Sequence, residues 1–97
     1  MVVACTQEFA CSIDVYERVT EDLIKENIQP TGLLFHWVAE LDGPHIRITD
    51  VWESREALDQ WGARTAAVAQ RHEVPEPVVE VLEVSHYQAG ADLSQQV

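Results

Sequence analysis

The spacing of the apolar residues switches repeatedly along the chain, and this switching constrains the fold more than any other feature. Residues 2–9, VVACTQEF, are short and β-prone, and they predict a first strand. Between residues 11 and 27 the apolar side chains recur at helical spacing with charged side chains opposite them, which predicts an amphipathic helix. Asp14 is its predicted cap, with Glu17 completing a capping box, and the segment NIQPTG ends it.

A hairpin and a second helix are predicted next. Residues 33–41, LLFHWVAEL, and 45–52, HIRITDVW, are strand-like and flank DGP, a turn signal, so they predict an antiparallel pair. Ser54 is the predicted cap of a helix that runs to about Arg71. The predicted buried stripe of this helix is Leu58, Trp61, Thr65, Val68 and Ala69. The prolines of EVPEP exclude helix, and residues 78–87 predict the last strand.

The predicted element order β-α-β-β-α-β defines the fold class. It is the ferredoxin-like α+β arrangement, in which a four-stranded antiparallel sheet carries two helices on one face. A chain of 97 residues allows one domain, which we assign to residues 1–87. Residues 88–97 have little to bury and are predicted to be a C-terminal tail, either flexible or an arm on a dimer partner.

The strand at residues 33–41 is apolar on both of its faces. Under strict alternation, Leu33, Phe35 and Trp37 point one way, and Leu34, His36 and Val38 point the other. Two helices on one side of the sheet cover one face only, so the other face needs a second cover. We therefore expect a homodimer, a dimeric α/β barrel in which two open sheet faces enclose an interior chamber.

The charge balance narrows the choice of partners. Six Lys and Arg residues against 17 Asp and Glu give a net charge of -11, which repels phosphate backbones and argues against nucleic acid. No apolar run approaches the about 20 residues that a membrane span needs. The start MVVACTQEF lacks the pattern of a signal peptide, and a cytoplasmic location is expected. Cys5 and Cys11 are expected to be reduced, structural thiols.

Motifs for metals and nucleotide cofactors are not found. His36, His45, His72 and His86 form no i,i+4 pair and no H-x-H pattern, so no metal site is predicted. The four glycines are isolated and form no phosphate loop, and no G-x-S-x-G nucleophile motif is present. The sequence predicts a protein that works without a cofactor.

The stretch DVWESREALDQW, placed after a hairpin, resembles the dimeric α/β-barrel superfamily, and within it the antibiotic-biosynthesis-monooxygenase-like branch. The pattern W-x-S-x-x-A followed by an apolar residue is matched by Trp52, Ser54, Ala57 and Leu58, and PTGLLFH before the second strand also fits. The resemblance covers roughly residues 2–87 in architecture. Its members include cofactor-free oxygenases acting on aromatic polyketides, haem-degrading enzymes, cyclases, isomerases and proteins without known activity. A shared fold does not by itself transmit a reaction.

The haem-degrading members of this superfamily allow a residue-by-residue comparison. They use a Trp and a downstream His on the second helix, and an Asn on the first strand. Trp61 matches the Trp, but Arg71 stands where the iron-binding His would be and His72 comes one residue later. One residue turns a side chain by about 100° around a helix. The first strand offers Gln7 in place of Asn. These departures argue against haem.

His36 is the first candidate for catalysis. A His on a strand that faces an enclosed interior can be a general base or acid, and the alternative is a hydrogen-bonded core residue. Its neighbours depend on the hairpin register. One register places Thr49 opposite His36 and Arg47 opposite Val38, whereas a slip of one residue places Asp50 beside His36. The slipped register is mildly favoured, because Asp50 would otherwise need another partner on a covered face.

Aromatic side chains supply the predicted binding surface for a flat hydrophobic ligand. The residues predicted to bind substrate are Trp37, Trp52, Trp61, Thr49, His86 and Tyr87, with a structural role as the alternative for each. His86 and Tyr87 are placed at the mouth of the cavity, because they end the last predicted strand. Arg47 is predicted to hold a carboxylate or an enolate, or else to form a surface ion pair.

The sequence favours an enzyme that acts on a hydrophobic, aromatic or polyketide-like small molecule. By resemblance it would be a cofactor-independent monooxygenase, or a cyclase or isomerase that works by proton transfer. In that scheme His36 is the general base, Asp50 or Thr49 orients it, and Arg47 stabilises the developing anion. The alternative is a ligand-binding or accessory protein without catalysis, whose pocket binds but shows no pH-dependent rate.

Overall fold

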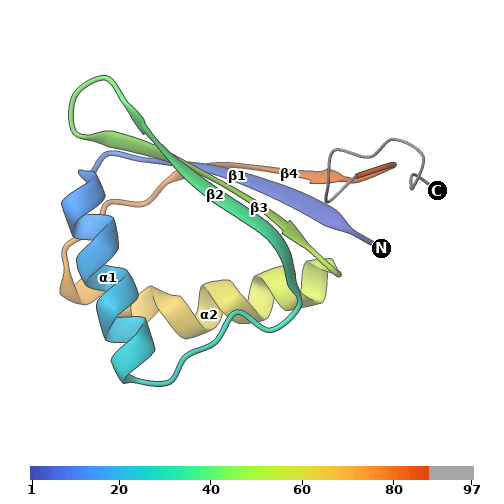
Figure 1. Ribbon diagram of the computed structural model, residues 1–97, viewed down its shortest axis with the longest axis horizontal. Helices are drawn as coiled ribbons and strands as arrows, with labels where there is room; N and C mark the ends of the chain where they lie inside the picture. The colour runs from blue at the N-terminus through green and yellow to red at the C-terminus, as the bar shows by residue number, and fades with distance from the viewer. Residues whose placement is uncertain (88–97) are drawn as a thin grey trace.

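The computed structural model describes residues 1–87 and contains six elements in the predicted order. The elements are β1 (Val3–Phe9), α1 (Ile13–Lys25), β2 (Leu33–Leu41), β3 (His45–Trp52), α2 (Arg55–Arg71) and β4 (Val78–Glu83). Both helices lie on the same side of the sheet (Figure 1). This arrangement confirms the predicted ferredoxin-like α+β class. The predicted tail at residues 88–97 lies outside the described residues.

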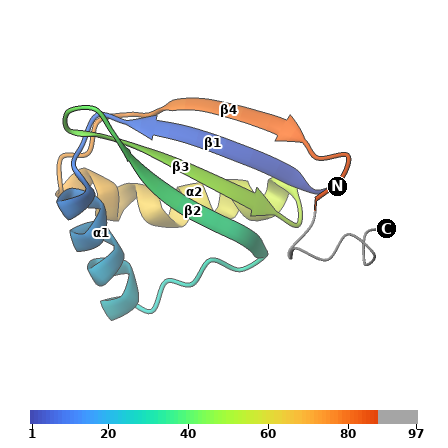
Figure 2. The same cartoon turned by 45° about the horizontal axis from the view of Figure 1, so that its top comes forward.

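The four strands form one antiparallel sheet in the order β2-β3-β1-β4 (Figure 2). The two strands of the predicted hairpin, β2 and β3, have the bounds that the sequence predicted. β1 lies between β3 and β4, so β2 and β4 are the edge strands of the sheet. His36 is on β2, and solvent can therefore reach it along an outer edge of the sheet.

Serine residues cap both helices. Ser12 caps α1, and its side chain accepts a hydrogen bond from the Val15 N–H at 3.4 Å. The predicted cap, Asp14, was wrong, because Ser12 has the extended backbone of a cap whereas Asp14 already lies in the first helical turn. Ser54 caps α2 as predicted and accepts from the Ala57 N–H at 3.1 Å. Among the described residues, neither helix combines the length and apolar character needed to cross a membrane.

The core lies between the sheet and the helices. Ile46, Ile48, Asp50 and Trp52 of β3 are buried, while the residues between them are more exposed. This alternation marks the helix-covered face of the sheet. Val68 of α2 packs into the same layer at 1% exposure, and the rest of the predicted stripe of α2 is partly buried. Burying one such side chain contributes about 1.5–3 kcal/mol relative to exposing it.

A β-bulge changes which residues of β2 share a face. The register shifts between Leu33 and Phe35, so Leu33 pairs with Trp52 and faces the helices. His36 faces the helices as well, opposite Asp50, whereas Phe35 points to the open face. The prediction that Leu33, Phe35 and Trp37 share one face was wrong at Leu33, because a bulge adds one residue to the strand and inverts the alternation.

The last strand is shorter than predicted. β4 ends at Glu83, which pairs with Val3 at the start of β1. One further bond, from the Val84 N–H to the Val2 carbonyl at 2.9 Å, extends the pairing. The pairing with β1 stops there, so His86 and Tyr87 come after β4 and do not form its end.

Gly32 places the chain entering β2 against the start of α2. Its φ of 88° lies in the left-handed region, which favours glycine. A Cβ at this position would lie 2.9 Å from the Ala57 Cβ, closer than two carbon atoms tolerate. The Gly32 carbonyl also accepts a hydrogen bond from the Glu53 N–H at 2.9 Å. This close approach explains the glycine of PTGLLFH.

The open face of the sheet, on the side away from the helices, carries exposed apolar side chains. Phe35 and Trp37 of β2 are 47% and 40% exposed, and Val78 and Leu82 of β4 lie on the same face and are also exposed. No other element of residues 1–87 covers these side chains. The sequence predicted that a second copy of the chain covers the open face with His36 on it, and this placement was wrong, because Phe35 and Trp37 lie on the open face and His36 lies under the helices.

Candidate active site

A cavity of about 380 Å³ lies between the helix-covered face of the sheet and the two helices. Its lining is mostly apolar and includes Phe9 of β1, Leu23 of α1 and Trp61 of α2. Pockets for small molecules typically measure about 300–1,000 Å³, so this cavity can hold a ligand of one to a few rings. It lies within a single chain, whereas the predicted chamber lay between the open faces of two chains.

His36 and Asp50 form the polar centre of the cavity wall. They pair across β2 and β3, and His36 Nδ1 lies 2.5 Å from Asp50 Oδ1. The same register sets Trp37 opposite Thr49 and Val38 opposite Ile48. The slipped register that the sequence favoured is therefore the one observed. The other register, with Thr49 opposite His36, is wrong, and the buried Asp50 carboxylate has the partner it needs.

Tyr16 extends this pair into a chain of three groups. Its hydroxyl oxygen lies 2.9 Å from His36 Nε2, and the two rings stack with centroids 6.3 Å apart at 18°. Tyr16 lies within residues 11–27, which the sequence predicted as an amphipathic helix, and it was given no chemical role. The feature that could have indicated a role for Tyr16 is its phenolic hydroxyl, because a buried tyrosine hydroxyl needs a hydrogen-bond partner.

The direction of these hydrogen bonds follows from the chemistry of the groups. An ionised carboxylate only accepts, so His36 Nδ1–H donates to Asp50, and Nε2 is left to accept from the Tyr16 hydroxyl. Burial raises the pKa of Tyr16, the nearby Asp50 charge raises it further, and a hydrogen bond with Thr20 lowers it in part. Tyr16 is thus a neutral phenol at neutral pH and a proton donor to His36.

The exposure of the pair suits an acid–base site. The His36 side chain is 35% exposed while the Asp50 side chain is 6% exposed. Because His36 also lines the cavity, it stands where the cavity meets solvent. A buried carboxylate thus orients an imidazole that protons can reach from outside.

Two tryptophans form an aromatic wall of the cavity. The Trp52 and Trp61 rings have centroids 6.0 Å apart, tilted by 39°, and both residues line the cavity. Trp52 is fully buried, and its Nε1 has no hydrogen-bond partner among the described residues. A buried indole N–H normally finds an acceptor, so this unpaired donor is an exception among the described residues.

Several predicted site residues do not line the cavity. Arg47, Thr49 and Trp37 lie on the open face, because the observed register and the alternation of the strands turn them away from the helices. Arg47 pairs with Glu8 at 2.6 Å, the surface ion pair that was its alternative. The exposed His86 and Tyr87 follow β4 and are not among the lining residues. Of the predicted site residues, the cavity brings together His36, Asp50, Trp52 and Trp61.

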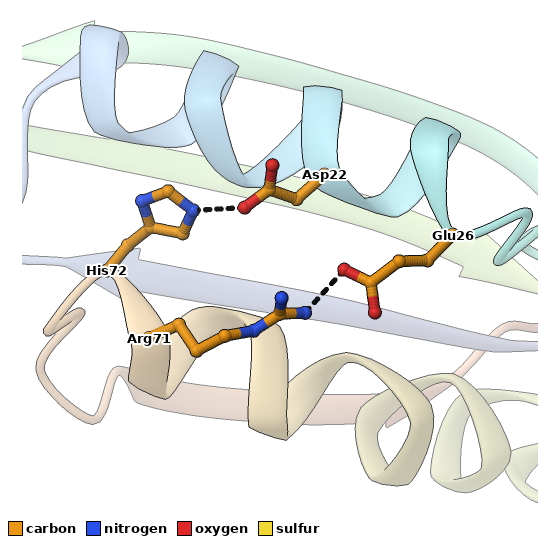
Figure 3. A network of polar contacts seen from close by, with 4 residues as sticks. All are labelled: Asp22, Glu26, Arg71 and His72. Atoms are coloured by element: carbon orange, nitrogen blue, oxygen red, sulfur yellow. Dashed lines mark hydrogen bonds and ion pairs between the residues drawn. The ribbon is translucent and has the colours of Figure 1, made fainter.

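The positions compared with the haem-degrading enzymes have other contacts. His72 Nε2 lies 2.6 Å from Asp22, and Arg71 Nη2 lies 2.5 Å from Glu26, so both side chains reach from α2 towards α1 (Figure 3). Neither residue lines the cavity. Within residues 1–87, no group of three or more His, Cys, Asp or Glu side chains could hold a metal ion.

Comparison with known proteins shows likeness at the level of the fold. No protein-family model and no curated protein matches the chain. Rv0793 from Mycobacterium tuberculosis is similar in structure, with a TM-score of 0.65 at 21% identity over 93% of this chain and 100% of that one. SnoaB, a cofactor-independent oxygenase from Streptomyces nogalater, has a TM-score of 0.65 at 11% identity over 92% and 98%.

A third similar structure is a proposed antibiotic biosynthesis monooxygenase from Deinococcus radiodurans. It has a TM-score of 0.60 at 16% identity, covering 95% of this chain and 100% of that one. Identities this low transmit a fold and not a reaction. The chain has the ferredoxin-like fold of the antibiotic-biosynthesis-monooxygenase-like proteins.

Proposed function

We propose that this protein is a homodimeric, cofactor-independent enzyme that removes a proton from a hydrophobic aromatic or polyketide-like substrate. The observation that carries the proposal is the chain of Tyr16, His36 and Asp50 in the wall of an apolar cavity. A base oriented by a buried carboxylate is a recurring arrangement for proton transfer. SnoaB, which has a similar fold, is a cofactor-independent oxygenase, so a fold of this kind is compatible with such chemistry.

The hydrogen-bond chain gives each residue a role. The proton of the substrate passes to the Tyr16 oxygen while the Tyr16 proton passes to His36 Nε2, which lies 2.9 Å away. His36 becomes an imidazolium, and the Asp50 carboxylate at Nδ1 stabilises its positive charge. The Tyr16 hydroxyl can donate to the resulting substrate anion. Arg47, on the open face, takes no part.

Monooxygenation, cyclisation and isomerisation can all start from this substrate anion. The anion can react with dioxygen, attack an internal carbonyl group, or take up a proton at another atom. The cavity residues account for the shared first step, in which the proton leaves. Which product follows depends on the substrate and on access of dioxygen.

Hydrogen exchange on a simple ketone tests the shared step. 2-Tetralone is a neutral bicyclic ketone with acidic benzylic hydrogens, and its exchange with deuterated water is followed by NMR. We expect the protein to accelerate this exchange and His36→Gln to lower the acceleration by on the order of 10²-fold or more. His45→Gln changes an exposed histidine at the start of β3, outside the cavity lining, and is the matched control.

The outcomes separate the enzyme from its alternative. If 2-tetralone binds to the cavity but the protein does not accelerate exchange, the chain is a ligand-binding or accessory protein. If His36→Gln exchanges as fast as the unsubstituted protein, His36 is not the base. An oxygen electrode run with the same samples shows whether the anion is consumed by dioxygen.

Dimerisation is part of the proposal because of the open face. Phe35 and Trp37 are large apolar side chains that residues 1–87 leave uncovered. A contiguous apolar patch on a sheet face is a common site of association, and a second copy of the chain presents the same patch. The dimer would leave the cavity intact, since the cavity lies on the other side of the sheet.

A further inference from the structure

We propose that the cavity selects the neutral form of an acidic aromatic ligand over anionic analogues of the same size, and that Asp50 is the residue that determines this selectivity. The inference rests on the proposed function, because it describes the substrate class of the same site. It concerns binding, which can be measured without turnover.

The lining of the cavity has no basic side chain except His36. All six Lys and Arg residues of the chain lie within residues 1–87, and none of them lines the cavity. Three arginines are paired with carboxylates elsewhere: Arg47 with Glu8, Arg55 with Asp59 and Arg71 with Glu26. Arg64 donates to the Gln29 carbonyl at 3.0 Å. No guanidinium or ammonium group is therefore in place to receive an anion.

The helix ends do not replace the missing cations. Backbone N–H groups in the first turn of a helix can bind anions. The first turns here, residues 13–15 of α1 and 55–57 of α2, are not among the residues that line the cavity. The other donors at the wall are uncharged: the Tyr16 hydroxyl, which already bonds to His36, the buried indole N–H of Trp52, and the side chains of Gln7, Thr20, Gln29 and Thr65, of which Thr65 donates to the Trp61 carbonyl.

The charge balance then distinguishes a neutral acid from an anion. An anion that enters beside the ionised Asp50 places two negative charges in a mostly apolar cavity, which is unfavourable. A neutral acid adds no charge on entry. When its proton moves to Tyr16 and the Tyr16 proton moves to His36, the new anion and the new imidazolium cancel. The net charge of the site stays that of Asp50 throughout.

Three naphthalenes of nearly equal size test the selectivity by quenching of tryptophan fluorescence at neutral pH. 2-Naphthol is a neutral acid, 2-methoxynaphthalene is neutral without an acidic hydrogen, and 2-naphthoate is an anion. We expect 2-naphthol to bind most tightly, and 2-naphthoate to bind about tenfold more weakly or worse, from the like-charge repulsion with Asp50. Asp50→Asn should tighten 2-naphthoate by about fivefold or more and leave 2-methoxynaphthalene within about twofold.

Asp42→Asn separates the site from the overall charge of the protein. Asp42 is exposed in the hairpin turn, and its replacement changes the net charge of -11 by the same one unit as Asp50→Asn. If the two variants tighten 2-naphthoate equally, the general field of the protein excludes the anion and Asp50 is not the determinant. If the unsubstituted protein binds 2-naphthoate as tightly as 2-naphthol, the proposal is wrong, whether or not Asp50→Asn folds.

The 2-tetralone assay keeps this inference distinct from the proposed function. If the protein accelerates 2-tetralone exchange but binds 2-naphthoate as tightly as 2-naphthol, the proposed enzymatic function stands and the proposed selectivity is wrong. If the protein binds 2-naphthol more tightly than 2-naphthoate but does not accelerate 2-tetralone exchange, the cavity is a binding site for neutral ligands and the catalytic proposal is wrong.

Discussion

His36 Nδ1 lies 2.5 Å from Asp50 Oδ1, although the two residues are 14 positions apart in the sequence. The contact joins an edge strand to a central strand, and it places the more exposed partner at the edge of the sheet. Orientation of an imidazole by a buried carboxylate sets which ring nitrogen carries the proton. Here the result is an Nε2 that faces Tyr16 and the cavity.

Replacement of Asp50 by Asn should slow proton transfer without unfolding the protein. The amide oxygen of Asn can still accept from His36 Nδ1–H, but it cannot neutralise an imidazolium. We expect the 2-tetralone exchange rate to fall by on the order of 10²-fold. Thermal unfolding checks that the fold is kept, and Asp42→Asn is the matched control. An unchanged exchange rate would show that Asp50 does not support the base.

Tyr16→Phe should separate proton relay from ligand binding. We expect it to slow 2-tetralone exchange by about tenfold or more, because the hydroxyl that links substrate to His36 is lost. Binding of 2-methoxynaphthalene should change little, since the ring remains. Tyr87→Phe, which alters an exposed tyrosine outside the cavity lining, is the control. Equal rates in the two variants would remove Tyr16 from the relay.

Tyr16→Phe also reports on the ionisation of Tyr16. Burial raises the pKa of its phenol. The difference between the alkaline absorbance titrations of the unsubstituted protein and Tyr16→Phe should show a tyrosine that ionises above about pH 10. A transition below that value would contradict the role of Tyr16 as a neutral donor.

The two cysteines should differ in their reaction with iodoacetamide. Burial raises the pKa of both thiols, and the Asp50 charge adds to this effect at Cys5. The reactive thiolate is therefore scarce in the folded protein. Cys11 lines the cavity and Cys5 does not, so Cys11 should be alkylated first, and 2-naphthol should protect it. Mass spectrometry on Cys5→Ala and Cys11→Ala reads each site, and faster labelling of Cys5 would contradict the assignment.

The contact of Asp22 with His72 predicts a loss of stability in acid. A hydrogen bond from His72 holds the pKa of Asp22 below its usual range. A carboxyl group whose pKa is depressed by folding stabilises the protein fully above its unfolded pKa, and this contribution disappears as the pH falls through the folded value. Urea midpoints should therefore decrease below about pH 4, less steeply in Asp22→Asn than in the unsubstituted protein.

Glu26→Gln is the control for this acid transition. It removes the neighbouring pair with Arg71, which also joins α1 to α2 (Figure 3), but keeps the bond between Asp22 and His72. The part of the acid transition that belongs to Asp22 should persist in Glu26→Gln. If the urea midpoints of Asp22→Asn and of the unsubstituted protein fall equally steeply with decreasing pH, the contact is not formed in solution.

Trp37→Asp should convert the expected dimer into a monomer. A carboxylate in the centre of an apolar contact loses its hydration without gaining a partner, so association becomes unfavourable. Light scattering measures the mass, and Thr31→Asp adds the same charge on an exposed loop as a control. Because Trp37 faces away from the cavity, binding of 2-naphthol should be retained. If light scattering shows that the unsubstituted protein is already a monomer, the dimer is no longer part of the proposal.

Local physics accounts for the parts of the fold that the sequence predicted. The strands at residues 33–41 and 45–52 end where Asp42, Gly43 and Pro44 favour a turn, and Ser54 begins a helix because its hydroxyl can satisfy a free N–H group. These features depend on residues a few positions apart. The pairing of His36 with Asp50 could be favoured from the sequence as well, since a buried carboxylate needs a partner.

The sequence by itself determined the element order, the N-terminal cap of α2 and the need of Asp50 for a neighbour. Only the tertiary structure decided that Tyr16 meets His36, that Arg47 and Thr49 face away, and that the cavity lies under the helices. The physical reason is that the bulge in β2 and the rotation of α1 over the sheet are set by packing between distant segments. One residue of slip in a strand, or a partial turn of a helix, moves a side chain to another face without changing the local pattern.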